Sequence, residues 1–99
     1  MDCKKTLTEL DEYVEEIHSA YKDYVDKVRV YKSKQSNLWL DTDFKEVLGT
    51  GRPTVDEKKA YVNKHLEVER TARDEAYYEI EYLKYKIDIC NQKLKVCNE

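Results

Sequence analysis

The sequence predicts an all-α fold: an antiparallel, coiled-coil-like helical hairpin with a short connecting helix and one very long C-terminal helix. Two Gly and one Pro in 99 residues leave few turns, so the helices must be few and long. Apolar residues make up 40% and charged residues 39%, a balance typical of long amphipathic helices. We expect a single domain, residues 1–99, with a helix at 4–33, an aromatic connector at 34–53 and a long helix at 54–97.

The first expected helix, at 4–33, carries apolar side chains at alternating spacings of three and four over four heptads, which indicates one continuous contact stripe. The stripe consists of Leu7, Leu10, Val14, Ile17, Tyr21, Tyr24, Val28 and Tyr31. Acidic residues crowd the beginning of the helix and basic residues its end, as the helix macrodipole favours. The alternative is that the bases bind phosphate.

A polar stretch at 33–37, where the connector 34–53 begins, is where we expect the first helix to end. Asp43 and Glu46 form a possible capping box for a short helix that Gly49 ends. An apolar group must then be buried against another surface: Trp39, Phe44, Val47 and Leu48. These side chains either cap the first turns of the long helix or form an exposed docking site for a protein partner.

The long helix is expected to begin at Thr54, because Thr54 and Glu57 can form a capping box directly after Pro53. Residues 54–97 then contain neither Gly nor Pro. One stripe on this helix faces the hairpin partner: Val62, Leu66, Glu69, Arg73, Ala76, Ile80, Leu83, Ile87, Cys90, Leu94 and Cys97. A second stripe lies on the opposite face: Tyr78, Tyr82, Tyr85, Ile89 and Val96. Because a helix with one neighbour keeps its back face polar, the second stripe predicts self-association.

Blocks of opposite charge predict an antiparallel register in which paired residue numbers sum to about 102. In this register Val28 and Tyr31 face Glu69 and Arg73, and tyrosine hydroxyls are expected to satisfy those charges. Pairing between two copies satisfies the same pattern, although we favour pairing within one chain. An isolated two-helix rod is marginally stable, so we expect a homodimer or a higher homo-oligomer.

Composition and motif content argue against several functions. The net charge of −3 is too small for wholesale neutralisation of phosphate, and the longest apolar run is too short to cross a membrane. His18 and His65 lie far apart, and no pattern indicates a catalytic, cofactor-binding or metal site, so we expect no enzyme activity, cofactor or metal. Three Cys without a secretory context predict reduced thiols in a cytoplasm, with the cysteines as small core residues. Zinc binding and a disulfide between chains are the alternatives for these thiols.

A resemblance to a known group rests on residues 42–94. The matching stretches are Thr42, Asp43, Phe44, Lys45, Leu48 and Gly49, then Lys59, Ala60, Tyr61, Val62, Leu66 and Glu69, then Glu81, Tyr82, Leu83, Lys84 and Ile87. In these stretches the chain resembles a group of small bacteriophage accessory proteins with a TDFK-x-LG turn before a long charged helix. It departs from them after Gly49, where the group commonly continues with a different turn, and residues 4–33 are not matched. The resemblance implies a phage-encoded protein of the host cytoplasm and transfers no site residues.

These observations predict a non-enzymatic protein–protein interaction module, an accessory factor that binds a host or phage protein, including a component of antiviral defence. The expected mechanism is docking of helix faces, with the second stripe for self-association and the connector aromatics for a partner. One alternative is a single-stranded nucleic-acid-binding protein of phage recombination or replication, with Lys27, Arg29, Lys32 and Lys34 near tyrosines as the contact residues. Another is a scaffold or chaperone for virion assembly.

Overall fold

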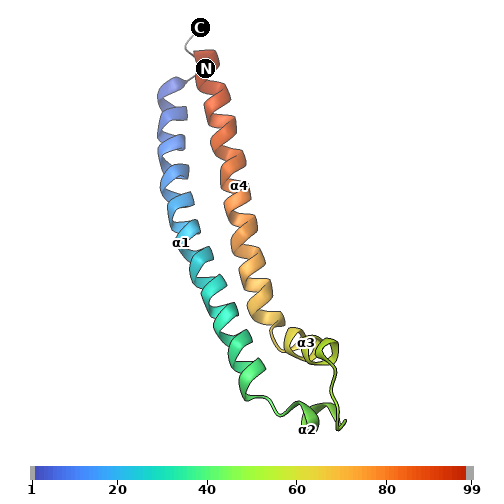
Figure 1. The fold of residues 1–99 in the computed structure, drawn as a ribbon. Helices are drawn as coiled ribbons and strands as arrows, with labels where there is room; N and C mark the ends of the chain where they lie inside the picture. The colour runs from blue at the N-terminus through green and yellow to red at the C-terminus, as the bar shows by residue number, and fades with distance from the viewer. Residues whose placement is uncertain (1, 98–99) are drawn as a thin grey trace. The chain divides into compact units, whose positions relative to one another are not determined.

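The computed structural model describes residues 2–97, so the two ends of the expected domain 1–99 lie outside the described residues. Every regular element in this range is helical, which confirms the predicted all-α class (Figure 1). In chain order the helices are α1 (Cys3–Asp41), α2 (Phe44–Leu48), α3 (Val55–Lys64) and α4 (Glu67–Cys97).

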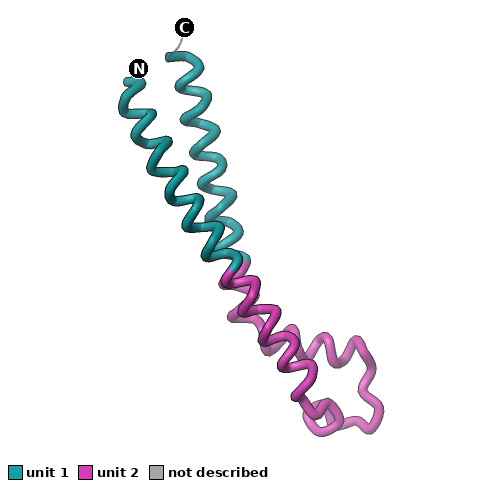
Figure 2. The backbone as a smooth tube through the Cα atoms, turned by 60° about the vertical axis from the view of Figure 1, so that its left-hand side comes forward, with its two compact units in different colours: residues 1–25, 74–99 teal, residues 26–73 magenta. Residues whose placement is uncertain are grey.

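The chain forms two compact units, residues 1–25 with 74–99 and residues 26–73 (Figure 2). In the first unit the beginning of α1 runs antiparallel beside the end of α4 (Figure 1). In the second unit the rest of α1 packs with α2, α3 and the first turns of α4. Each unit is described separately below.

The helix expected at 4–33 continues to Asp41, and the predicted break at 33–37 is wrong. That stretch is polar but contains no Gly or Pro, and polarity alone does not interrupt the hydrogen bonds of a helix. Trp39 therefore lies on α1 rather than in the connector. Leu38, one residue before it, packs against the core of the second unit.

Both predicted helix starts after α1 are confirmed, although only the Asp43 half of the first predicted capping box forms. The Asp43 carboxylate accepts the backbone N–H of Glu46, and Gly49 ends α2 at a φ of 65°, a left-handed conformation that suits glycine. Thr54 and Glu57 form the complete capping box of α3, with each side chain accepting the other residue's backbone N–H.

The single helix expected at 54–97 is wrong, because it is divided into α3 and α4 at His65 and Leu66. The Leu66 N–H donates to the Asn63 carbonyl rather than to the carbonyl four residues back. His65 lies at this interruption and contacts the preceding turn of α3. Its ring stacks on Tyr61 at 4.1 Å between centroids, and Nδ1 lies 2.9 Å from the Tyr61 carbonyl oxygen. The break is favoured by burial, since Val62 and Leu66, on either side of it, both join the core of the second unit.

That core is built around Phe44, Val62 and Leu66, with Tyr31, Leu38, Leu48 and Tyr61 packed against it. The Phe44 ring meets Tyr61 edge-on at 5.9 Å between centroids, and the ammonium of Lys58 lies 5.5 Å from the Phe44 centroid. The cap interpretation of the connector is therefore correct for Phe44 and Leu48.

The predicted antiparallel register is confirmed within each unit. In the first unit Cys3 bonds to Cys97, and the rings of Tyr24 and Tyr77 lie 6.1 Å apart. In the second unit Lys34 Nζ lies 2.7 Å from Glu69 Oε1, and the Arg73 guanidinium lies 4.5 Å from the centroid of the Tyr31 ring. The ring face of Tyr31 thus contacts Arg73, and the ammonium of Lys34 contacts Glu69.

The stripe predicted for α1 is correct at five of its eight positions. Leu7, Val14 and Tyr21 are exposed, and the other five residues are half-buried: Leu10, Ile17, Tyr24, Val28 and Tyr31. Thr6 and Ala20 turn inward instead, and the Thr6 hydroxyl donates to the Asp2 carbonyl over 3.1 Å. A threonine that satisfies its hydroxyl locally and a small alanine can both occupy a close helix–helix contact, and hydrophobicity alone does not reveal this.

The prediction of three reduced cysteines is wrong. Cys3 and Cys97 form a disulfide within the chain, with their Cα atoms 6.0 Å apart, and Cys90 is a free, buried thiol. In the predicted register Cys3 and Cys97 lie opposite one another, since their numbers sum to 100, but the composition favoured free thiols over a bond. Only Cys90 fulfils the expected role of a small core residue.

Candidate protein-interaction surface

The outward face of α4 in the first unit is apolar, which is unusual for a solvent-facing helix surface. Its opposite face buries Ala76, Ile80, Leu83 and Cys90. Because α-helical residues repeat every 3.6 positions, the residues of the predicted second stripe point away from that buried face. We call this stripe the tyrosine face: Tyr78, Tyr82, Tyr85, Ile89 and Val96.

The structure places the tyrosine face in solvent, as the sequence predicted. Tyr78 and Tyr85 are 68% and 63% exposed, Tyr82 and Val96 are also exposed, and Ile89 is half-buried. Within residues 2–97, none of these side chains is covered by α1 to the extent that Leu83 is. The face therefore places apolar side chains along one side of α4 over about five turns of helix, most densely from Tyr78 to Ile89.

Local contacts order the face without covering it. Tyr77 and Tyr78 meet edge-on at 5.9 Å between centroids, and Lys86 Nζ lies 5.6 Å from the centroid of Tyr82. Lys84 Nζ donates to Glu81 over 3.4 Å, and this bond, with a further contribution from Tyr21, raises the pKa of Lys84 above its ordinary value. Charged groups thus border the tyrosine rings.

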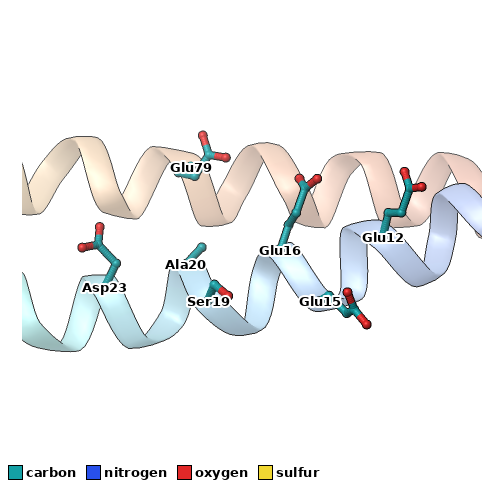
Figure 3. Close-up of a pocket in the computed structure, with 7 residues that line it drawn as sticks. All are labelled: Glu12, Glu15, Glu16, Ser19, Ala20, Asp23 and Glu79. Atoms are coloured by element: carbon teal, nitrogen blue, oxygen red, sulfur yellow. The ribbon is translucent and has the colours of Figure 1, made fainter.

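An acidic groove lies between α1 and α4 in the same unit, with a volume of about 630 Å³ (Figure 3). Glu79 lines it from α4, and the other lining residues come from α1: Glu12, Glu15, Glu16, Ser19, Ala20 and Asp23. No lining residue is basic. The groove therefore carries a negative potential along one side of α4.

Sequence reasoning missed a second exposed apolar stripe, formed on α1 by Leu7, Val14 and Tyr21. The signal was present, since these residues repeat every seven positions, but it was assigned to the intramolecular contact. The smaller inward residues Thr6 and Ala20 were the clue to the true orientation of α1.

The proposed partner-binding residues of the connector are divided by the structure. Phe44 is 8% exposed, so its ring is occupied within the chain, and Leu48 is half-buried. Trp39 and Val47 remain exposed, although the Trp39 ring also contacts Phe44 at 5.7 Å between centroids. Val47 and Leu48 line a groove of about 460 Å³ with residues of α3, including Tyr61, and with His65 directly after α3.

Carboxylates engage Arg29 and Lys34 among the candidate nucleic-acid residues. Arg29 Nη1 lies 3.6 Å from Asp26 Oδ1, and Lys34 donates to Glu69. Lys32 is exposed and Lys27 is half-buried. This arrangement gives no uninterrupted basic track along α1.

Replacing Lys34 by methionine is expected to raise the pKa of Glu69. The hydrogen bond from Lys34 holds that pKa below its ordinary value, with a backbone hydrogen bond acting in the same direction. Since the folded-state pKa is lowered, the ion pair stabilises the fold above the unfolded-state pKa and is lost as the pH falls through the folded-state value. An NMR titration of the Glu69 carboxyl carbon measures the change. Lys32→Met is the matched control, and an unmoved pKa in Lys34→Met would contradict the assignment.

Among residues 2–97, no group of three or more His, Cys, Asp or Glu side chains is arranged to hold a metal ion. Over the same residues, no helix combines the length and the hydrophobicity that crossing a bilayer requires. Comparisons with protein-family models, with curated proteins and with solved structures return no match for this chain. The fold and surfaces alone therefore define the class of the protein, an all-α chain with an exposed aromatic helix face.

Proposed function

We propose that this protein is a non-enzymatic protein–protein interaction module that docks through helix faces, and that its tyrosine face mediates self-association. The observation that carries the proposal is the exposure of Tyr78, Tyr82 and Tyr85 on a helix whose opposite face is already buried. Soluble proteins rarely leave large contiguous apolar patches uncovered, and tyrosine is enriched in protein interfaces. The exposed side chains of Trp39 and Val47 are the candidate contacts for a different protein partner.

The biological setting we propose is that of a phage accessory factor in the host cytoplasm, acting on a host or phage protein, including a defence component. The resemblance over residues 42–94 supports this setting. The cysteines no longer support a cytoplasmic location, because Cys3 and Cys97 are paired. A scaffold or chaperone for virion assembly uses the same kind of surface, and co-purification with a virion structural protein from infected cells distinguishes it.

Tyr85→Glu is expected to convert the self-associated protein to the monomer. The substitution places a charge in the middle of the apolar face, where it would be desolvated on association. Because Tyr85 is exposed in the single chain, the helical content should be unchanged by circular dichroism. Light scattering after size-exclusion chromatography measures the mass across a range of concentrations.

Val14→Glu is the matched control, because it places the same charge on the exposed stripe of α1 in the same unit. Its mass should equal that of the unmodified protein. A monomeric Val14→Glu variant beside an unaffected Tyr85→Glu variant would show that the α1 stripe is the contact surface and would contradict the assignment to α4.

A further inference from the structure

The charges on one side of the tyrosine face change sign at its centre. Glu75 and Glu79 border its first half, and Lys86 and Lys93 border its second half. At 100° per residue, these four residues lie on the same side of the line of tyrosines, within about a quarter-turn of it. Acidic residues therefore precede basic residues along this flank. A second copy that runs in the opposite direction presents basic residues opposite the acidic ones.

We propose that a second copy of this chain covers the tyrosine face in an antiparallel, two-fold symmetric contact between two α4 helices. The proposal rests on the function proposed above and adds its partner, direction and register. In this register the numbers of facing residues sum to about 167. The two-fold axis then passes between Leu83 and Lys84.

The apolar residues fit this register. Tyr78 faces Ile89 of the second copy, and Tyr82 faces Tyr85 of the second copy, so two-fold symmetry produces four apolar layers. Their spacing of four, three and four residues is the alternation that lets two helices stay in contact along their length. Val96 lies beyond these layers and is not needed for them.

The flanking charges fit the same register. In an antiparallel pair each flank meets the equivalent flank of the other helix, so Glu79 meets Lys86 of the second copy and Glu75 meets Lys93. Symmetry doubles both pairs. On the other flank Glu81 approaches Asp88 of the second copy, and Lys84, which already donates to Glu81, offsets that repulsion.

A parallel contact is disfavoured by the same residues. In a parallel contact each flank meets the opposite flank of the second copy, and residues of similar number lie at the same height. Glu75 and Glu79 would then lie beside Asp74 and Glu81 of the second copy. Like charges would then face one another over the first half of the contact. The antiparallel direction replaces those contacts with acid–base pairs.

The acidic groove adds to the preference for a lysine opposite Glu79. Glu79 lines that groove with four carboxylates of α1, Glu12, Glu15, Glu16 and Asp23 (Figure 3). Lys86 of the second copy would approach from the open side of this negative surface. The field of the groove therefore favours a basic residue at that position and disfavours an acidic one.

Charge reversal and mixing test the direction of the contact. Glu79→Lys places lysine against Lys86 twice in each dimer, and Lys86→Glu places glutamate against Glu79 twice. Each variant alone is expected to weaken dimerisation roughly tenfold, the effect of losing two exposed ion pairs and creating two repulsions. Mixing the two variants should restore assembly as a heterodimer, because each then supplies the charge that the other lacks.

Zero-length carbodiimide coupling should link Glu75 to Lys93 between isotopically distinct chains of the unmodified protein.

The outcomes separate this proposal from the general function. If the unmodified protein dimerises and Tyr85→Glu abolishes the dimer, but mixing gives no heterodimer and no link joins Glu75 to Lys93, the antiparallel register is wrong while self-association through α4 stands. If the unmodified protein is monomeric at every concentration, both are wrong. Recovery on mixing with the expected link supports the register.

Discussion

Reducing the Cys3–Cys97 disulfide is expected to lower the free energy of unfolding by about 2–5 kcal/mol. The bond joins residues separated by 94 positions, close to the full length of the chain. Closing a loop of this size restricts the unfolded ensemble strongly, and in the folded state the bond fastens the free ends of α1 and α4 in the first unit. Urea denaturation with and without reductant measures the difference.

The double variant Cys3→Ser/Cys97→Ser is the control for this experiment. Its stability should match that of the reduced protein and should not respond to reductant. Alkylation of the denatured, unreduced protein should modify one cysteine, Cys90, and three after reduction. Three alkylated cysteines without reductant would show that the disulfide is absent.

Leu83→Ala is expected to destabilise the protein by about 2–5 kcal/mol, the range for a buried leucine truncated in a packed core. Leu83 is 1% exposed and lies on the inward face of α4 between Ile80 and Cys90. The free energy of unfolding is small for any domain, and a pair of helices buries few residues. Each buried residue therefore contributes a large share of that free energy. The measurement is best made in the Tyr85→Glu background, where association does not add to the apparent stability.

Leu40→Ala gives the same chemical change at a leucine that is 79% exposed. Its effect on the urea midpoint should be close to zero, since little apolar surface is returned to water. Equal losses in Leu83→Ala and Leu40→Ala would contradict the inward orientation of α4 on which the exposure of the tyrosine face depends.

The helix caps and the turn at Gly49 could be predicted from the sequence, because each depends only on a residue and its near neighbours. The Thr54–Glu57 capping box, the Asp43 cap and the left-handed Gly49 depend on groups within three or four positions of one another. The antiparallel register was also predictable, because blocks of opposite charge and a long apolar period constrain it over many residues.

The sequence was sufficient to identify the tyrosine face of α4 as a candidate surface. The other apolar stripe of α4 accounts for the contact with α1, so the tyrosine face had no neighbour within the hairpin. The same reasoning failed on α1. There the structure buries Thr6, half-buries Ala20 and exposes Leu7 and Val14, a choice that depends on how closely two backbones approach. Phe44 was ambiguous for a similar reason, since only its contacts with Val62 and Leu66 show that it belongs to a core.

By itself, the sequence determined the helical class, the positions of the caps, the pairing register and the apolar back face of α4. Only the tertiary structure decided that the C-terminal helix is interrupted at His65, that α1 continues to Asp41 and that Cys3 bonds to Cys97. The physical reason is the range of the interactions involved. Caps and periodicity act between near neighbours, whereas the break and the disulfide depend on groups that only folding brings together, the Phe44 core in one unit and the two chain ends in the other.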